Sequence, residues 1–267
     1  MTELILPVPG PDAPVALVTG GGRGIGRACA LRLAAAGHKV AVVSRSLDEI
    51  DEVAALIHQG GGFATSAVCD VADPDSVEFA LKMCVDRLGA VDVLVNNAGV
   101  ASAVPFLEMS LSDFRRMLDV NLVGTFLCTR AVLPRMVERK HGRIINVAST
   151  AGLFGTRYTA HYCAAKHGVV GMTRALALEV ARAGVTVNAV CPGWVDTDLL
   201  GSAVENISAK TGRTVAESRE ALLKGIPTRR FTSPERVAEL VGFLASAAAA
   251  DITGTTLTVD GGETAGH

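Results

Sequence analysis

The stretch YTAHYCAAKHG (158–168) holds two tyrosines, two histidines, a cysteine and a lysine within three turns of a helix. A lysine ammonium one helical turn from a phenol favours the phenolate and lowers a pKa that is normally about 10. Only Tyr162 has such a partner: Lys166 follows it four residues later, whereas Tyr158 is followed at this spacing by Tyr162. The spacing predicts that Tyr162 exchanges a proton with a substrate near neutral pH.

The other reactive side chains of this stretch are not expected to react. His161 and His167 project from other faces of the helix, and we favour partial exposure on its surface for both. Cys163 is expected at the surface or in packing. Tyr158 precedes Tyr162 by one turn, on the side expected for a substrate, and is predicted to line the pocket.

Short β-branched segments alternate with longer Ala- and Leu-rich segments elsewhere in the chain. The expected strands are 15–19, 39–44, 64–71, 91–96, 142–149, 185–192 and 256–262. The expected helices are 26–37, 46–59, 73–89, 112–139 with a bend near Pro134, 159–183 and 233–246. Apolar strands separated by helices predict an α/β fold with one doubly wound (Rossmann) parallel sheet of about seven strands, covered by helices on both faces.

Composition indicates a single domain over 15–267, because 49% of the 267 residues are apolar and no linker or repeat interrupts the pattern. Residues 1–14 contain four prolines and are expected to form a flexible arm without a signal sequence or membrane anchor. The net charge of −2 disfavours nucleic acid and anionic membranes as partners. Six scattered cysteines lack metal-ligand spacing, which predicts no metal site and a reducing, cytoplasmic location.

Ligands of such sheets bind beyond the carboxyl ends of the strands. The first strand is followed by TGGGRGIG (19–26), where glycines allow a phosphate to approach a helix N-terminus. The spacing of its glycines is T-G-x-x-x-G-x-G rather than G-x-G-x-x-G. The alternative to a phosphate-binding loop is a glycine-rich turn that binds no ligand. The residues expected to contact a dinucleotide here are Thr19, Gly20, Arg23, Gly24, Ile25 and Gly26.

The residues after the second strand bear on the choice of dinucleotide. NAD sites usually place a carboxylate there, but this chain has Ser44 followed by Arg45. Arg45, with Arg23 as a second cation, would suit a 2′-phosphate, although both could instead be solvated surface residues. Asp70 after the third strand, next to Val71, either accepts from an adenine amino group or caps the next segment.

Three further strand ends carry polar groups. The fourth strand leads into NNAG (96–99), the fifth ends at Ser149, and the sixth leads into PGWVDT (192–197), where Thr197 is placed to hydrogen-bond a nicotinamide carboxamide. The residues expected to contact the cofactor at these ends are Asn97, Ala98, Gly99, Pro192, Gly193, Val195 and Thr197, together with Tyr162 and Lys166.

These motifs, in this order over about 15–262, resemble the short-chain dehydrogenase/reductase family, and DVNLVGTF (119–126) adds the family's asparagine, Asn121. The resemblance implies hydride transfer between a nicotinamide and a carbonyl or alcohol. It implies that Tyr162 is the general acid or base and that Ser149 hydrogen-bonds the substrate oxygen. It also implies that Lys166 lowers the pKa of Tyr162 and holds the nicotinamide ribose, while Asn121 holds a water that connects Lys166 to solvent.

Within the family, residues 166–197 and the SRS turn are most similar to 3-oxoacyl thioester reductases, including polyketide ketoreductases, which implies NADPH. The 3-hydroxybutyrate dehydrogenases are also similar, but Ala101 and Ala151 stand where they have a glutamine and a histidine, which argues against a small free acid and NAD. Two other kinds of function remain as alternatives: a dehydrogenase of cyclic alcohols, sugars or steroids, and a non-catalytic regulator that binds a dinucleotide. The expected substrate contacts are Tyr158, Trp194 and Leu199.

The segment 196–230 is expected to be the substrate lid. It is either an ordinary solvated helix pair or a site for the phosphate of a CoA or phosphopantetheine arm. Its basic residues are Lys210, Arg213, Arg219, Lys224, Arg229 and Arg230. The resemblance finally implies a homotetramer, with the helices over 112–139 and 159–183 at one interface and the last helix and strand at the other.

Overall fold

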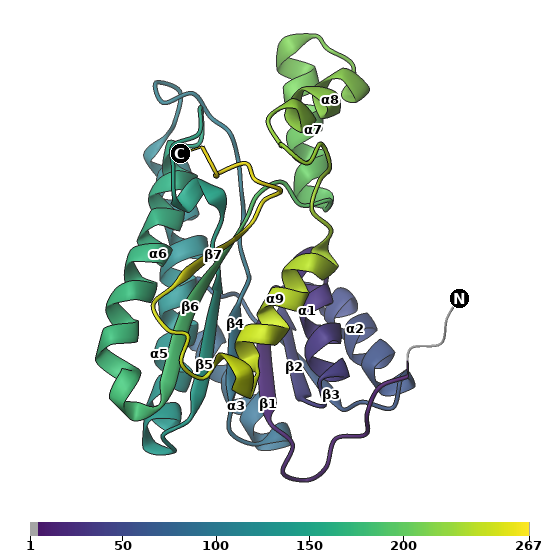
Figure 1. Ribbon diagram of the computed structural model, residues 1–267, viewed down its shortest axis with the longest axis vertical. Coiled ribbons are helices and arrows are strands. Elements are labelled where there is room, and N and C mark those ends of the chain that lie inside the picture. Colours follow the sequence, from purple (N-terminus) through teal and green to yellow (C-terminus); the bar gives the residue numbers. More distant parts are fainter. Residues whose placement is uncertain (1–4, 267) are drawn as a thin grey trace.

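One parallel sheet forms the centre of the computed structural model, which describes residues 5–266 (Figure 1). The strand order is β3-β2-β1-β4-β5-β6-β7, and every neighbouring pair is parallel. The predicted doubly wound α/β fold is therefore confirmed. The strands are β1 (Val15–Thr19), β2 (Lys39–Ser44), β3 (Ala64–Val68), β4 (Val93–Asn96), β5 (Gly142–Val147), β6 (Val185–Pro192) and β7 (Thr256–Val259).

Helices cover both faces of the sheet. One apolar cluster joins α1, α2 and α9 to one face, and a second joins α3, α5 and α6 to the other. The helices are α1 (Gly24–Ala35), α2 (Leu47–Gln59), α3 (Pro74–Leu88), α4 (Leu111–Leu118), α5 (Gly124–Glu138), α6 (Ala160–Val180), α7 (Asp198–Thr211), α8 (Val215–Lys224) and α9 (Pro234–Ala245).

The apolar strands belong to both clusters because successive side chains of a strand point to opposite faces. In β1, Ala16 and Val18 pack with α1 and α9, whereas Val15 and Leu17 pack with the helices of the other face. A strand buried on both sides has no polar face. This explains the continuous apolar runs in the sequence.

A single helical stretch covers residues 111–138, and it is interrupted at Asn121, whereas it continues through Pro134 without an interruption. A π-helical turn over Asp119–Val123 separates α4 from α5, while Pro134 lies inside α5. Leu111–Glu138 is the one helix among the described residues that is long and apolar enough to cross a membrane by length and composition. Here α5 packs against α3, β4 and β5, as a core helix does.

A ladder of buried side-chain amides and hydroxyls joins the two central strands to the helices on one face. The Asn96 amide donates to Thr129 on α5 and to Asn146 on β5, each at 2.9 Å. Asn146 in turn donates to Thr173 on α6 at 2.8 Å. These bonds hold α5 and α6 in fixed positions on the strands whose ends carry the site.

The segments outside this core are the N-terminal residues and the α7–α8 pair. Of the expected arm, residues 1–4 lie outside the described part. Residues 5–14 contain no helix or strand, but Leu6 is buried and donates its amide to Gly60 at 2.7 Å. The helices α7 and α8 lie together beyond the sheet, at the end where the chain leaves β6 (Figure 1).

Candidate active site

Thr19 and Asn97 join the loop after β1 to the loop after β4. The Thr19 hydroxyl accepts from the amides of Asn97 and Ala98, both at 3.0 Å. The Asn97 side chain donates to the carbonyls of Thr19 and Gly20, both at 3.1 Å. Asn97, predicted to contact a cofactor, therefore also shapes the loop that would hold one.

The glycine loop is packed too tightly for side chains at four of its positions, which are Gly20, Gly21, Gly22 and Gly26. A Cβ on Gly26 would lie 2.1 Å from the Gly20 carbonyl oxygen, and Gly20 itself has a φ of 60°. The loop leads into α1, whose N-cap Arg23 makes no side-chain cap and whose first turn has no acidic residue. By contrast, α4 and α8 begin with complete capping boxes. The first amides and the positive dipole end of α1 are thus available to a pyrophosphate, and the residues present fit a dinucleotide.

The two arginines predicted to meet a 2′-phosphate are in different situations. Arg23 lies 3.6 Å from Glu49 and 3.7 Å from Asp198, so two carboxylates already share its charge. Arg45 is exposed after β2 and has no ion pair with any described residue. Ser44 beside it is bonded within its own turn, to Ser46. Arg45 is the better placed of the two cations.

Asp70 caps the turn that follows β3. Its carboxylate accepts from the amide of Ala72 at 3.0 Å, and its own amide donates to the Ser76 hydroxyl at 3.0 Å. Val71 is buried against Gly124, where a Cβ would lie 2.7 Å from a Val71 methyl. The sequence allows two roles for Asp70, contact with an adenine amino group and capping of the next segment. The hydrogen bonds in the structure are those of the capping role.

The loop after β6 lies against the glycine loop. A Cβ on Gly24 would be 3.1 Å from the Thr197 methyl, so these two predicted cofactor residues are neighbours. The loop is held by two backbone bonds of 2.9 Å, between Thr232 and the flanking residues Trp194 and Asp196. The remaining residues predicted to contact the cofactor or the substrate differ in exposure: Pro192 and Val195 are buried, Gly193 and Ile25 are half-buried, and Leu199 is exposed.

Ser149, Tyr162 and Lys166 come together beyond the end of β5. The Ser149 hydroxyl accepts from the Ala151 amide at 3.1 Å and is hydrogen-bonded to Tyr162. The Lys166 ammonium donates to the Val147 carbonyl at 2.9 Å and lies 5.8 Å from the centroid of the Tyr162 ring. A serine hydroxyl beside a phenol is suited to hold one oxygen atom of a substrate and to exchange its proton.

The predicted lowering of the Tyr162 pKa by Lys166 is not found. Burial raises the pKa of Tyr162 to about 12, with the hydrogen bond from Ser149 acting in the opposite direction. Burial also lowers the pKa of Lys166, to about 8. The one-turn spacing can be read from the sequence, but the burial of Lys166, the partial burial of Tyr162 and the bond of the ammonium to Val147 cannot.

Asn121 lies at the π turn and connects it to the loop after β4. Its side chain donates to the Val100 carbonyl at 2.9 Å and to the Met117 carbonyl at 3.0 Å, and it accepts from the Val100 amide at 3.3 Å. A Cβ on Gly99 would lie 2.7 Å from its oxygen. Asn121 is therefore well placed to set the position of this loop, a role that the family motif does not reveal.

The expected surface position of His161 is wrong. Its side chain is fully buried, and its Nε2 atom lies 3.0 Å from the Ser102 hydroxyl. The prediction failed because the α6 face that bears His161 packs under a loop that comes from another part of the sequence. His167 is exposed as expected. Tyr158 is 61% exposed in a left-handed conformation (φ 65°), outside α6.

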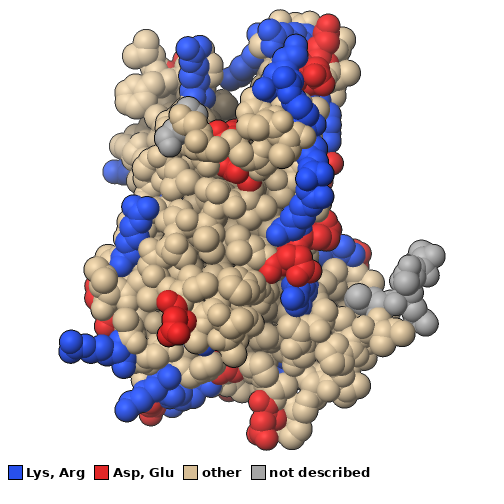
Figure 2. Space-filling model, in the orientation of Figure 1, with Lys and Arg blue, Asp and Glu red and all other residues tan. Residues whose placement is uncertain are grey.

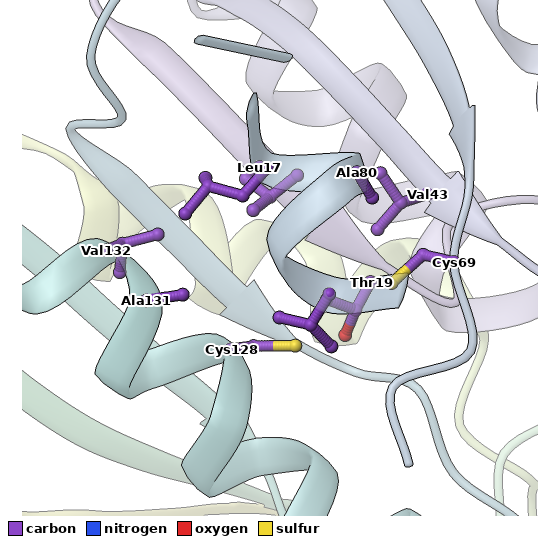
Figure 3. A pocket seen from close by; sticks show the side chains of 10 residues that line it. Leu17, Thr19, Val43, Cys69, Ala80, Cys128, Ala131 and Val132 are labelled. Carbon is purple, nitrogen blue, oxygen red and sulfur yellow. The ribbon is translucent and has the colours of Figure 1, made fainter. Parts of the chain in front are cut away.

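A separate apolar cavity lies inside the core and is not the site. It measures about 10 Å³ and is lined by β1, β2, α3 and α5 side chains, with Thr19 and the thiols of Cys69 and Cys128 as its polar members (Figure 3). That volume is close to one water molecule. Burial raises the pKa of both thiols, to about 11 and about 12, so they are unreactive.

Comparison with known proteins identifies the family. The family model for short chain dehydrogenases matches residues 14–208. A 3-oxoacyl-[acyl-carrier-protein] reductase of Synechocystis sp. is 46% identical over 94% of this chain and 96% of its own, and a D-beta-hydroxybutyrate dehydrogenase of Rhizobium meliloti is 38% identical over 94% and 98%. The crystal structure of an actinorhodin polyketide ketoreductase variant with NADPH superimposes with a TM-score of 0.93 at 40% identity, covering 96% of this chain and 98% of the other.

The chain therefore belongs to the short-chain dehydrogenase/reductase family. It is an NAD(P)-dependent oxidoreductase that acts on the CH–OH/C=O pair.

Proposed function

We propose that this enzyme is an NADPH-dependent ketoreductase whose substrate is a 3-oxoacyl thioester, carried on CoA, on an acyl carrier protein or on a polyketide synthase. The observation that carries the proposal is the placement of Ser149 and Tyr162 together beyond β5. They lie at the same edge of the sheet as the uncapped N-terminus of α1. The alternatives are a dehydrogenase of a hydroxyacyl-CoA, a 3-hydroxybutyrate-like acid or a cyclic or steroid alcohol.

The residues at the strand ends have complementary tasks in this proposal. Ser149 holds the carbonyl oxygen, and Tyr162 protonates it as negative charge develops. Lys166 and Asn121 supply and relay the proton that restores Tyr162. The nicotinamide cofactor, when bound, supplies the hydride. Because burial raises the pKa of Tyr162, the phenol holds its proton until the substrate oxygen becomes the stronger base.

The cofactor choice follows from the turn after β2. No carboxylate is present at Ser44 to bind a ribose 2′-hydroxyl, and the exposed Arg45 follows directly. A guanidinium has forked donors that match a phosphate. NADPH is also bound in the similar actinorhodin ketoreductase structure.

The thioester assignment is supported by the lid that we propose for residues 196–230. Lys and Arg side chains gather over the α7–α8 pair and along the edge below it (Figure 2). Arg219 is already bonded to Asp196 at 2.9 Å and lies over the Phe231 ring, and we therefore assign the phosphate of the carrier arm to the exposed Arg229 and Arg230 instead. The similar reductases at 46% and 40% identity are named for 3-oxoacyl and ketoacyl substrates.

A homotetramer in the cytoplasm completes the proposal. Apolar side chains remain exposed on α5 and α6, among them Phe126 and Leu178, as expected for faces covered by a second subunit. Sedimentation should therefore give a species of four chains. A monomer at micromolar concentration would contradict this part.

The test is NADPH oxidation with acetoacetyl-CoA, a longer 3-oxoacyl thioester, a cyclic ketone and a steroid ketone, repeated with NADH. We expect the highest kcat/KM for a thioester with NADPH. Preference for the cyclic or steroid ketone would overturn the substrate assignment, and preference for NADH would overturn the role of Arg45. Turnover of none of them, with NADPH still bound, would favour a non-catalytic dinucleotide-binding regulator.

A further inference from the structure

The loop after β4 is tied to four other parts of the molecule within five residues. Its partners are the π turn, the helix α6, the turn before α6 and the proposed lid. The bonds are Val100 with Asn121 at 2.9 and 3.3 Å, Ser102 with His161 at 3.0 Å, Ala103 with Lys210 at 3.4 Å, and Val104 with Tyr158 at 2.7 Å. Two of these elements, the π turn and α6, carry residues that we assign to the reaction, so the position of this loop is coupled to the site.

The bond between Ser102 and His161 is the only one of these links that joins two side chains. His161 directly precedes Tyr162 in α6, and consecutive helical residues project in directions about 100° apart. Tyr162 faces Ser149, while the His161 imidazole is directed at the loop. The same turn of helix therefore places the reacting phenol on one side and holds the loop on the other.

The environment of His161 suits a permanent hydrogen bond between neutral groups. The side chain has no exposed surface, and burial lowers the pKa of His161, with the Thr159 carbonyl and Asp113 acting in the opposite direction. A neutral imidazole has one donor and one acceptor nitrogen, and the Ser102 hydroxyl can match either role. An apolar side chain would fill the same space without fixing the loop.

We propose that His161 is a positioning residue for carbonyl reduction: through Ser102 it fixes the loop 97–110 against the helix that carries Tyr162 and Lys166. The loop begins with Asn97–Gly99, which are predicted to contact the cofactor. Further along, its Val104 amide is bonded to the carbonyl of Tyr158, the residue predicted to line the pocket. Its position sets where the carbonyl of a substrate lies relative to the Tyr162 hydroxyl. The kinetic part of this inference rests on the proposed function, whereas the structural part does not.

Hydrogen exchange tests the structural part without any substrate. The variants are Ser102→Ala, which changes an exposed residue and preserves the fold, His161→Phe, and the control His167→Phe, which changes the exposed histidine of the same helix. We expect faster exchange in peptides covering 97–110 for the first two variants and no change for the control. Unchanged exchange in Ser102→Ala would overturn the inference.

Steady-state kinetics tests the positioning role with whichever ketone the wild type reduces. Ser102→Ala and His161→Phe should each raise the KM for the ketone about two- to tenfold, the range of a lost hydrogen bond, with a smaller effect on kcat and none on the KM for NADPH. The double variant should be no worse than the poorer single one, because both remove the same bond. His161→Gln, which retains an acceptor, should recover part of the loss.

The outcomes separate this inference from the proposed function. Additive effects in the double variant, or a loss in His161→Phe that Ser102→Ala does not share, would mean that His161 acts only through packing and would overturn the inference. If the wild type reduces no ketone, the proposed function fails, and the exchange measurement still decides whether His161 fixes the loop.

Discussion

The Lys166 ammonium and the Tyr162 phenol lie one turn apart on α6, yet the ammonium is bonded to the Val147 carbonyl at 2.9 Å and lies 5.8 Å from the Tyr162 ring centroid. Burial lowers the pKa of Lys166 to about 8 and raises that of Tyr162 to about 12, so near neutral pH the lysine keeps its charge and the phenol keeps its proton. The pair is therefore an ammonium beside a protonated phenol rather than a preformed ion pair of ammonium and phenolate. The following predictions test this arrangement and its surroundings.

Removing the Tyr162 hydroxyl should remove the chemistry and spare binding. We expect Tyr162→Phe to lower kcat about 10²- to 10⁴-fold, the usual contribution of a general acid, because Tyr162 is the group beside Ser149 that we assign to protonate the substrate oxygen. NADPH affinity, measured by fluorescence, should stay unchanged. Tyr158→Phe is the matched control and should retain kcat, since Tyr158 lies outside α6 and is exposed. Full turnover by Tyr162→Phe would refute the mechanism.

The buried Lys166 should make stability depend on alkaline pH. Its lowered pKa means that the unfolded chain binds this proton more tightly, so the destabilisation is fully present below pH 8 and disappears between about pH 8 and 10.5. Compared with Lys166→Met, the wild type should gain at most about 3 kcal/mol in its free energy of unfolding across this interval. Urea unfolding of both proteins at pH 7.5, 9 and 10.5 measures it. A constant difference would show that the ammonium is not destabilised by burial.

Replacing Arg45 should change the cofactor preference. Arg45→Asp removes the cation for a 2′-phosphate and introduces a carboxylate that accepts a hydrogen bond from the ribose hydroxyls of NADH. We expect kcat/KM for NADPH to fall about 10- to 100-fold, the worth of a charged hydrogen bond, while that for NADH rises. Arg213→Asp on the exposed end of the lid is the control and should leave the ratio unchanged. An equal loss of kcat/KM for NADPH and NADH would show that Arg45 does not bind the 2′-phosphate.

The lid arginines should matter only for substrates that carry the long phosphorylated arm. In the double variant Arg229→Ala/Arg230→Ala we expect the KM for acetoacetyl-CoA to rise about tenfold and that for the pantetheine-truncated thioester to stay the same. The ratio of the two KM values is the measurement. Arg219→Ala is a useful comparison, because this arginine is already paired with Asp196. No difference between the two substrates would refute phosphate recognition by these residues.

The buried amide ladder should contribute to stability. Asn146→Ala removes one of the two hydrogen bonds of the Asn96 amide and the bond that the Thr173 hydroxyl accepts, both in the core. We expect a loss of about 1–3 kcal/mol in the free energy of unfolding, measured with urea. Asn206→Ala, on an exposed position of α7, should change it by less than about 0.5 kcal/mol. Equal effects would mean that the ladder adds nothing beyond surface contacts.

Several site residues could be predicted because their function depends on spacing along the chain. Glycines at the start of α1, the Tyr162–Lys166 turn and the polar residues after each strand all follow from local geometry, and the sheet order agrees with the alternation of strands and helices. His161 was misjudged for the opposite reason. Its burial depends on a loop 59 residues away in the sequence.

The sequence by itself determined the doubly wound sheet, its order of elements and the set of groups at the strand ends, because strand alternation and helical spacing are properties of neighbouring residues. Only the tertiary structure decided the electrostatic state of the site. Burial of Lys166 and Tyr162, the pairing of Arg23 with Glu49 and Asp198, and the contact of His161 with Ser102 all arise between segments far apart in the chain. A pKa follows the solvent and charges around a group, and these exist only once the distant segments have packed together.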